Sequence, residues 1–339
     1  MVLDIENAKH SIDLEQFLLG HDEIGHRFVE ILKNKSLSGV KVRIILDSAG
    51  SFAFFNSEHV KELKTAGVEI RFYNPISPWR VRNIFSWYWR DHRKILIIDN
   101  EIAYTGGVGL ESAMAKWRDT EVRITGVVLQ EVQYIFNRMW QIIDERKFKR
   151  FRLDRYQDAS FRFITNSPHF SQRLFYRRLV RSIRLAKNYI YLTTPYFIPN
   201  QRLSFILARA ARRGVDVRLI TPKQSDHPLV DQARNSYFAL AMKAGVRIYH
   251  YEGETLHAKT AVIDDNWATI GSSNLDNLSL LFNYEANLIS TDKNFVADLK
   301  EHFVNDLLLS TELEPAEWKK RSWVIKFIEL LTWPFHGLM

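Results

Sequence analysis

The sequence predicts an α/β fold of two pseudo-symmetric halves, each a mixed, largely parallel sheet flanked by helices. Short apolar strands alternate with helical segments along the 339 residues, as they do in α/β proteins. The order of these elements repeats, because residues 214–220 match residues 39–45 and residues 243–248 match residues 65–70. Each half ends in a copy of the same polar motif, so we expect the active site at the interface of the halves.

The elements of the first half follow from the spacing of its apolar residues. Alternation predicts a strand over residues 11–17, and helical spacing predicts a helix over residues 22–35. After these come a strand, a helix and a strand, over residues 39–47, 57–66 and 68–73. A single apolar face predicts a long helix over residues 127–149, which a basic segment ends.

The second half repeats this order. Its strand, helix and strand are expected over residues 189–192, 202–213 and 214–220. We place the boundary near residue 155, which gives an N-terminal half of residues 1–155 and a C-terminal half of residues 156–312. Each half then contains one copy of the polar motif, and residues 313–339 form a separate tail.

The tail has the pattern of an amphipathic helix. Between Trp318 and Trp333, Ser322, Lys326 and Glu329 share one helical face, and bulky apolar residues occupy the other. Basic residues precede this apolar face, which is typical of a helix that lies in a membrane interface. We therefore expect a membrane-associating tail, and the alternative is a terminal helix docked on the core.

An insertion at residues 75–90 directly precedes the first motif. It holds three tryptophans, a tyrosine and three arginines. Amphipathic aromatic side chains favour the boundary between water and lipid, so the insertion is predicted to form a lip that rests on a membrane. A loop packed on the protein's own surface and a groove that stacks single-stranded nucleic acid are the alternatives.

Composition narrows the class of protein. The net charge is +8, and arginine is concentrated in residues 146–155 and 177–184. Such stretches are usually solvated helix faces, and the functional alternatives are contact with an anionic membrane surface or with a nucleic-acid backbone. The absence of cysteine excludes disulfides, thiolate metal sites and thiol catalysis. No run approaches the roughly 18 apolar residues of a membrane-spanning helix, and no secretory signal is recognised at the start.

The polar motif itself occurs twice. Residues 257–264 read His-Ala-Lys-Thr-Ala-Val-Ile-Asp, and residues 92–99 read His-Arg-Lys-Ile-Leu-Ile-Ile-Asp. A glycine pair or Gly-Ser follows each aspartate at the same interval. Because alternate residues of a strand project to one face, each histidine is expected beside its lysine. Lysine, serine, asparagine and backbone N–H groups are donors that suit a phosphate.

The doubled motif resembles the signature of the phospholipase D superfamily, and within it the chain is most similar to bacterial cardiolipin synthases. Residues 194–199, residues 117–120 and the basic, aromatic tail strengthen the second resemblance. It implies a phospholipase D-like fold with two related halves. Similar proteins carry additional chain before residue 11, including a strand, so we expect one sheet edge to differ here.

Displacement at a phosphodiester needs a nucleophile on one side of phosphorus and an acid on the other. His92 and His257 meet this requirement, and attack by a neutral imidazole would give a phosphohistidine intermediate. The resemblance favours His92 as the nucleophile and His257 as the acid, whereas the symmetry of the sequence permits the reverse. Lys94 and Lys259 would hold the non-bridging oxygens. The chemistry requires neither a metal nor a cofactor.

Further residues complete the predicted site. Gly107, Ser272 and Asn274 are expected to bind the substrate phosphate through neutral donors. A nucleophilic histidine also needs its second ring nitrogen held, and the resemblance suggests Asp119 and Glu285 for that role.

The aspartates that end the motifs, Asp99 and Asp264, belong to the catalytic signature. They lie too far along their strands to touch a phosphate, so we expect them to support the loop and the lysines. At one position the chain departs from the signature, because Gly109 stands where the first motif should have asparagine. We expect the backbone N–H of Gly107 to contribute on that side.

The leading hypothesis is a cardiolipin synthase that transfers a phosphatidyl group from phosphatidylglycerol to phosphatidylglycerol or another phospholipid. Its partners would be phospholipid substrates and an anionic membrane, as a peripheral protein on the cytoplasmic face of a bacterial cell membrane. A phospholipase D that releases phosphatidic acid is the first alternative. A nuclease of the superfamily agrees with the net charge, but the tryptophan-rich lip and the tail argue against a nucleic-acid partner. A non-catalytic binding module is disfavoured because both histidines and both lysines are present.

Overall fold

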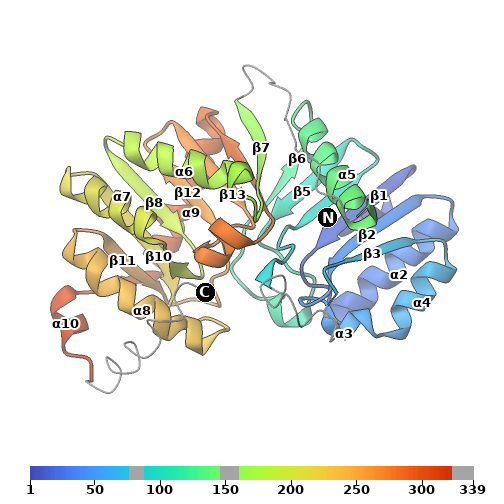
Figure 1. Ribbon diagram of the computed structural model, residues 1–339, viewed down its shortest axis with the longest axis horizontal. Coiled ribbons are helices and arrows are strands. Elements are labelled where there is room, and N and C mark those ends of the chain that lie inside the picture. The colour runs from blue at the N-terminus through green and yellow to red at the C-terminus, as the bar shows by residue number, and fades with distance from the viewer. Residues whose placement is uncertain (76–87, 146–159, 323–339) are drawn as a thin grey trace.

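The computed structural model describes residues 1–75, 88–145 and 160–322. These residues form two large sheets, which lie side by side in Figure 1, with helices packed against each. The predicted α/β fold of two repeated halves is confirmed. Every strand and helix predicted above for residues 11–73 and 189–220 is present within a few residues of its expected bounds.

The first sheet has six strands in the order β3-β2-β1-β4-β5-β6. Their bounds are β1 Ser11–Gln16, β2 Lys41–Asp47, β3 Glu69–Tyr73, β4 Ile95–Ile98, β5 Ile102–Gly106 and β6 Glu121–Ile124. The helices of this half are α1 Val2–Glu6, α2 Glu23–Leu37, α3 Phe52–Phe55, α4 Glu58–Thr65 and α5 Leu129–Glu145. Buried residues of α2 and α4 pack with β1 and β2 in one apolar cluster, which covers one face of the sheet.

The second sheet has eight strands in the order β16-β11-β10-β8-β12-β13-β15-β7. They are β7 Phe161–Asn166, β8 Tyr189–Thr193, β10 Asp216–Pro222, β11 Arg247–Tyr251, β12 Thr260–Ile263, β13 Trp267–Gly271, β15 Glu285–Ser290 and β16 Ser310–Glu312. The short strands β9 Phe197–Ile198 and β14 Leu275–Asp276 pair separately. The helices are α6 Leu174–Leu185, α7 Gln201–Arg212, α8 Pro228–Lys243, α9 Lys293–Leu308 and α10 Pro315–Lys319.

The sheets are mixed, but the prediction that they are largely parallel is wrong. Only β1 to β3 in the first sheet, and β8, β10 and β11 in the second, pair in parallel. The motif strands β4 and β12 continue through tight turns into β5 and β13, and such a connection produces antiparallel pairing. Asp99 and Asn100 have φ values of 51° and 56° in the first of these turns, a conformation that Asp and Asn tolerate well.

A shared apolar cluster joins the two halves. It contains Ile95 and Ile97 of β4, Phe136 of α5, and Val262 and Leu288 of the second sheet, all almost fully buried. Its burial holds the halves in one orientation, because separating them would expose this surface to water. The helix predicted over residues 127–149 supplies much of this cluster as α5, through its single apolar face.

One edge of the first sheet differs from the second, as expected. Strand β15 pairs with β7, whereas its counterpart β6 is an edge strand among the described residues.

The structure describes only part of the two predicted membrane segments. In the tail, Trp318 packs its ring 5.6 Å from that of Phe238 and 6.2 Å from that of His250, so the start of the tail is docked on the C-terminal half. The predicted amphipathic face beyond residue 322 and the centre of the lip, residues 76–87, lie outside the described residues. No helix in the described ranges combines the length and the apolar character needed to cross a membrane.

Candidate active site

Both motif histidines line one cavity of about 750 Å³ at the junction of the halves. They lie three residues before the first residues of β4 and β12, and not on these strands as the sequence suggested. The N-terminal half contributes Phe17 and Met114 to the cavity wall, and the C-terminal half contributes Tyr196. The site is therefore built from both halves.

Each histidine is held by a carboxylate of the opposite half. Nδ1 of His92 lies 3.0 Å from Oε1 of Glu285, and Nδ1 of His257 lies 2.7 Å from Oδ2 of Asp119. The two carboxylates suggested by the sequence thus occupy matching positions. Because each binds through Nδ1, Nε2 of each histidine is left for chemistry.

Backbone hydrogen bonds between the halves place each carboxylate beside the histidine of the opposite half. The N–H of His92 donates to the carbonyl of Tyr284 over 3.0 Å, one residue before Glu285. The N–H of His257 donates to the carbonyl of Arg118 over 2.8 Å, one residue before Asp119. Each motif segment is therefore attached to the segment that carries the opposite carboxylate.

Arg118 reinforces the second of these contacts, and sequence reasoning gave it no role. Its guanidinium binds Asp306 of α9 with two hydrogen bonds, of 2.8 Å and 2.9 Å. A third guanidinium nitrogen donates to the backbone carbonyl of Asp119 over 2.7 Å. The planar guanidinium thus fixes Asp119 against the opposite half. The signal in the sequence was an arginine directly before a candidate carboxylate.

Burial controls the ionisation of the histidines. It lowers the pKa of His257 to about 4, with the neighbouring Lys259 acting in the same direction and Asp119 opposing. Burial also lowers the pKa of His92, against the attraction of Glu285. Both imidazoles are thus neutral near pH 7 in the free protein, which is the form a nucleophile requires.

The lysines lie beside their histidines, as predicted. Nζ of Lys94 donates to the carbonyl of His92 over 3.1 Å, and Nζ of Lys259 donates to that of His257. Burial lowers the pKa of Lys94 and lowers that of Lys259 to about 7. An anion that entered the cavity would favour the charged ammonium form of both.

Two of the three predicted phosphate-binding residues already use their donors within the protein. The Ser272 hydroxyl donates to Glu285, and the N–H groups of Ser272 and Gly107 donate to backbone carbonyls over 3.0 Å and 3.2 Å. Ser272 therefore positions Glu285, and Gly107 leaves space, because a Cβ there would lie 2.2 Å from Asp119 Oδ1. Asn274 agrees better with the prediction, because its side chain lines the cavity.

The departure at Gly109 has a steric explanation. Gly109 lines the cavity, and a Cβ at this position would lie 2.5 Å from Sδ of Met114. Met114 thus occupies the space of the missing asparagine side chain. The cavity has a carboxamide on the C-terminal side and a thioether on the N-terminal side.

The motif aspartates lie at the far ends of the motif strands. Asp99 accepts hydrogen bonds from the N–H groups of Lys9, His10 and Ser11, each 2.7–2.8 Å long. Asp264 accepts from the N–H groups of residues 187 and 188 and of Tyr189, the first residue of β8, over 2.8–2.9 Å. The expectation that these aspartates support the loop and the lysines is therefore wrong. They bind free N–H groups where β1 and β8 begin, and these strands pair antiparallel with the motif strands β4 and β12.

A further carboxyl group, which the sequence reasoning missed, faces the cavity. Asp276 follows Asn274 by two residues, and burial raises the pKa of its side chain to about 7. Asp226 also lines the cavity and accepts a hydrogen bond from the Tyr196 hydroxyl. The spacing of Asp276 from the motif asparagine was the available signal.

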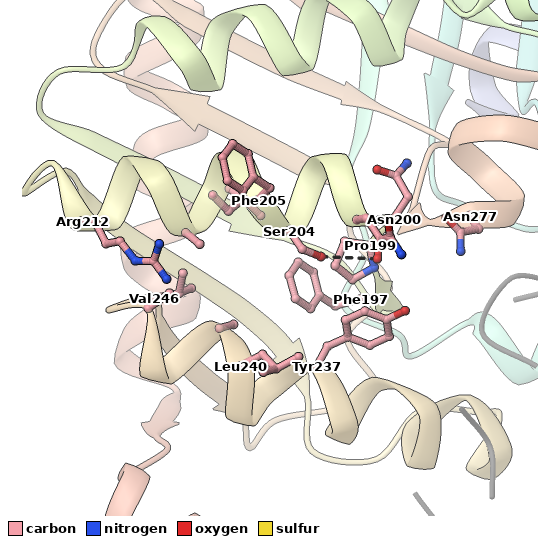
Figure 2. A pocket seen from close by; sticks show the side chains of 15 residues that line it. Phe197, Pro199, Asn200, Ser204, Phe205, Arg212, Tyr237, Leu240, Val246 and Asn277 are labelled. Atoms are coloured by element: carbon pink, nitrogen blue, oxygen red, sulfur yellow. Dashed lines mark hydrogen bonds between the residues drawn. The ribbon is translucent and has the colours of Figure 1, made fainter. Parts of the chain in front are cut away.

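A second cavity, of about 540 Å³, opens between α7 and α8 (Figure 2). Its walls are mostly apolar, with Phe205 of α7 and Leu240 of α8 exposed at its sides. The segment around β14 separates the two cavities, because Asn277 lines this one while its neighbours Asp276 and Leu278 line the first. An apolar space therefore adjoins the polar site.

The chain is similar to proteins of a known family. The family model described as "Cardiolipin synthase, PLD-like domain" matches residues 1–140 and 179–307. Cardiolipin synthase 1 of Bacillus cereus is 33% identical over 94% of this chain, and cardiolipin synthase A of Cronobacter sakazakii is 31% identical over 100% of this chain. The chain spans 66% and 73% of the length of these relatives, respectively.

The fold has a solved counterpart. The phosphatidylserine synthase of Haemophilus influenzae superposes on 98% of the chain, and 89% of that protein is covered, with a TM-score of 0.74. The identity is 14%, so this likeness describes the fold.

Proposed function

Because this chain belongs to the PLD-like family of cardiolipin synthases, we propose that it transfers a phosphatidyl group between two phospholipids through a phosphohistidine intermediate. The observation that carries the proposal is the pair of histidines in one cavity, each held through Nδ1 by a carboxylate of the other half. This arrangement provides a nucleophile and an acid for displacement at one phosphorus.

In the first step, Nε2 of His92 attacks the phosphorus of phosphatidylglycerol. A nitrogen–phosphorus bond forms, and the bond from phosphorus to the glycerol oxygen breaks. His257 gives its proton to that oxygen, and glycerol leaves. We assign the nucleophile to His92 on the family resemblance, because burial lowers the pKa of both histidines and does not distinguish them.

In the second step, His257 removes the proton from a hydroxyl group of the acceptor lipid. The freed oxygen attacks phosphorus, the bond to His92 breaks, and cardiolipin is released. His257 must gain a proton before the first step although its pKa is about 4 in the free protein. The negative charge of a bound phosphodiester raises this pKa and supplies the needed protonation.

Residues of the cavity wall and the buried Lys259 divide the tasks of substrate binding. Lys94 and Lys259 neutralise the non-bridging oxygens, and Asn274 donates to the same phosphate. Asp276 and Asp226 accept hydrogen bonds from the hydroxyl groups of a glycerol headgroup. The apolar cavity between α7 and α8 receives an acyl chain, since it adjoins the polar site and offers an apolar lining.

Residues 1–155 and 156–312 act as one catalytic unit, because neither half supplies the carboxylate for its own histidine. The protein acts at an anionic membrane as a peripheral protein of the cytoplasmic face. The half-exposed Tyr88 and Trp89, beside the cavity residue Arg90, support contact with lipid at the cavity mouth.

The test is incubation with phosphatidylglycerol vesicles, followed by mass spectrometry of the lipids, with the His92→Ala variant as control. We expect cardiolipin from the wild-type protein and none from the variant. Formation of phosphatidic acid in place of cardiolipin would identify a hydrolase, and no lipid turnover at all would overturn the proposal.

A further inference from the structure

Three histidines gather on the surface of the first half, outside the cavity. His21 lies in the loop after β1, His26 in the first turns of α2 and His59 at the start of α4. Their candidate ligand atoms all lie within 4.8 Å of one another. The ring centroids are 5.1 Å apart for His21 with His26 and with His59, and 4.5 Å apart for His26 with His59.

The start of α2 holds the first two histidines together. Asp22 is the N-cap of this helix and accepts hydrogen bonds from the N–H groups of Gly25, over 3.0 Å, and Ser112, over 2.7 Å. His21 and His26 therefore flank the cap at the two positions where apolar side chains usually meet across a helix start. The backbone of Gly25 packs against Gly20, because a Cβ at Gly25 would lie 1.8 Å from the Gly20 carbonyl oxygen. The cap thus places two imidazoles side by side before any ligand binds.

The third histidine has an orienting partner. Nδ1 of His59 lies 3.3 Å from Oε2 of Glu62, one turn further along α4. A carboxylate on one ring nitrogen leaves Nε2 as the ligand and increases its basicity, as it does in many metal sites.

We propose that His21, His26 and His59 bind one divalent transition-metal ion of the zinc class. Three imidazole nitrogens form a set that suits zinc, copper, nickel and cobalt, whereas calcium and magnesium prefer oxygen ligands. Nitrogen–metal bonds of about 2.0–2.1 Å require only small side-chain rotations from the present separations. His21 and His26 are exposed, so water completes the coordination.

The ion would connect the loop after β1 to two helices. That loop also forms part of the cavity wall, through Phe17 and Leu18. The ring of Phe17 stands edge-on to that of His92, with 4.9 Å between the centroids. The Ser51 hydroxyl already links the same loop to the segment before α3, by donating to the Phe17 carbonyl and accepting from the Leu19 N–H. Metal binding would add a second link to this wall from outside the cavity.

The test is titration of the full chain with cobalt(II), whose visible absorption reports nitrogen coordination, followed by displacement with zinc(II). We expect saturation at one ion per chain, loss of the cobalt spectrum on zinc addition, and a rise in the Tm of the wild-type protein with metal concentration. His26→Ala and His59→Ala should each abolish the spectrum and the Tm shift. His302→Ala, which removes an exposed histidine of α9, should change neither.

Equal Tm values of all variants without metal would show that they fold. The inference is overturned if the variant lacking all three histidines binds cobalt as the wild-type protein does, or if the wild-type protein does not saturate. Neither result bears on lipid transfer, because no residue of the cluster lines the catalytic cavity.

Discussion

Glu285 lies 3.0 Å from Nδ1 of His92, although the two residues belong to opposite halves of the chain. Asp119 and His257 repeat the relationship at 2.7 Å. Orientation of each imidazole thus depends on the docking of the halves, and Arg118 adds an ion pair with Asp306 to that docking.

Replacing Glu285 by Gln should reduce turnover by about 10²- to 10⁴-fold, because the amide no longer fixes the His92 tautomer or stabilises its positive charge. Asp119→Asn should have a similar effect through His257. Initial rates on phosphatidylglycerol vesicles measure both. Glu254→Gln, at an exposed acid of the same half, is the matched control, and a loss as large as in the other two would contradict the argument.

The roles of the histidines can be separated with a p-nitrophenyl phosphodiester. Its leaving group needs no acid, so His257→Ala should release about one p-nitrophenol per chain and then stop, with phosphate trapped on His92. His92→Ala should give no burst. Stopped-flow absorbance measures the release, and the opposite pattern would reassign the nucleophile to His257.

Binding of anions should weaken above about pH 7. The buried Lys259 has a pKa of about 7, so its ammonium form is present below that pH and is lost as the pH rises. Sulfate keeps its charge near neutral pH, and we expect its inhibition constant to rise by up to about tenfold per pH unit above 7. In Lys259→Arg the charge persists, and the dependence should flatten. A constant value in the wild-type protein up to pH 9 would contradict the role of Lys259.

Substitutions at Gly109 and Met114 can restore the asparagine of the motif to the cavity wall. Gly109→Asn alone brings its side chain against Met114 and should lower the free energy of unfolding by about 1 kcal/mol. Adding Met114→Ala removes the clash, so the double variant should recover stability and place a second carboxamide in the cavity. Denaturant unfolding measures the free energy of unfolding of each variant, and initial rates measure the effect of the second carboxamide on activity. Stability that stays as low in the double variant would show that Met114 is not the obstacle.

The cavity between α7 and α8 predicts a dependence on acyl chains. Ala208→Trp should fill it and reduce transfer from long-chain phosphatidylglycerol by about tenfold or more, since the chain loses buried apolar contact. Hydrolysis of the soluble p-nitrophenyl substrate should be unchanged. Ala239→Trp, on an exposed position of α8 outside the lining, is the control. Equal losses on both substrates would indicate misfolding and not a lipid site.

The sequence was sufficient for what local spacing determines. The strands, the helices and the two motifs follow from apolar periodicity and from a repeat, whereas Asp119 and Glu285 were suggested by the family resemblance. Contacts between distant segments were not accessible in this way. The exchange of carboxylates between the halves, the engagement of Ser272 by Glu285 and the capping by Asp99 each depend on which segments become neighbours after folding.

The same limit explains the error in the sheets. Strand β4 is apolar on both faces, as a buried parallel strand would be, and its direction is decided by the turn at Asp99 and Asn100. Gly109 likewise indicated only the loss of the asparagine carboxamide donor, because the spacing of residues does not predict that Met114 packs at this position.

The two histidine–carboxylate pairs are related by an approximate two-fold symmetry. Each half supplies the carboxylate that binds the histidine of the other half. Two identical half-length chains related by a two-fold rotation would therefore form the same pair of contacts. Such a pair must keep both sides alike. A single chain is free of that constraint, and its two motifs differ at equivalent positions. Ser272 corresponds to Gly107, and Asn274 corresponds to Gly109. One tandem polypeptide can thereby surround one phosphorus with two different walls, which suits the transfer between two lipids that we propose.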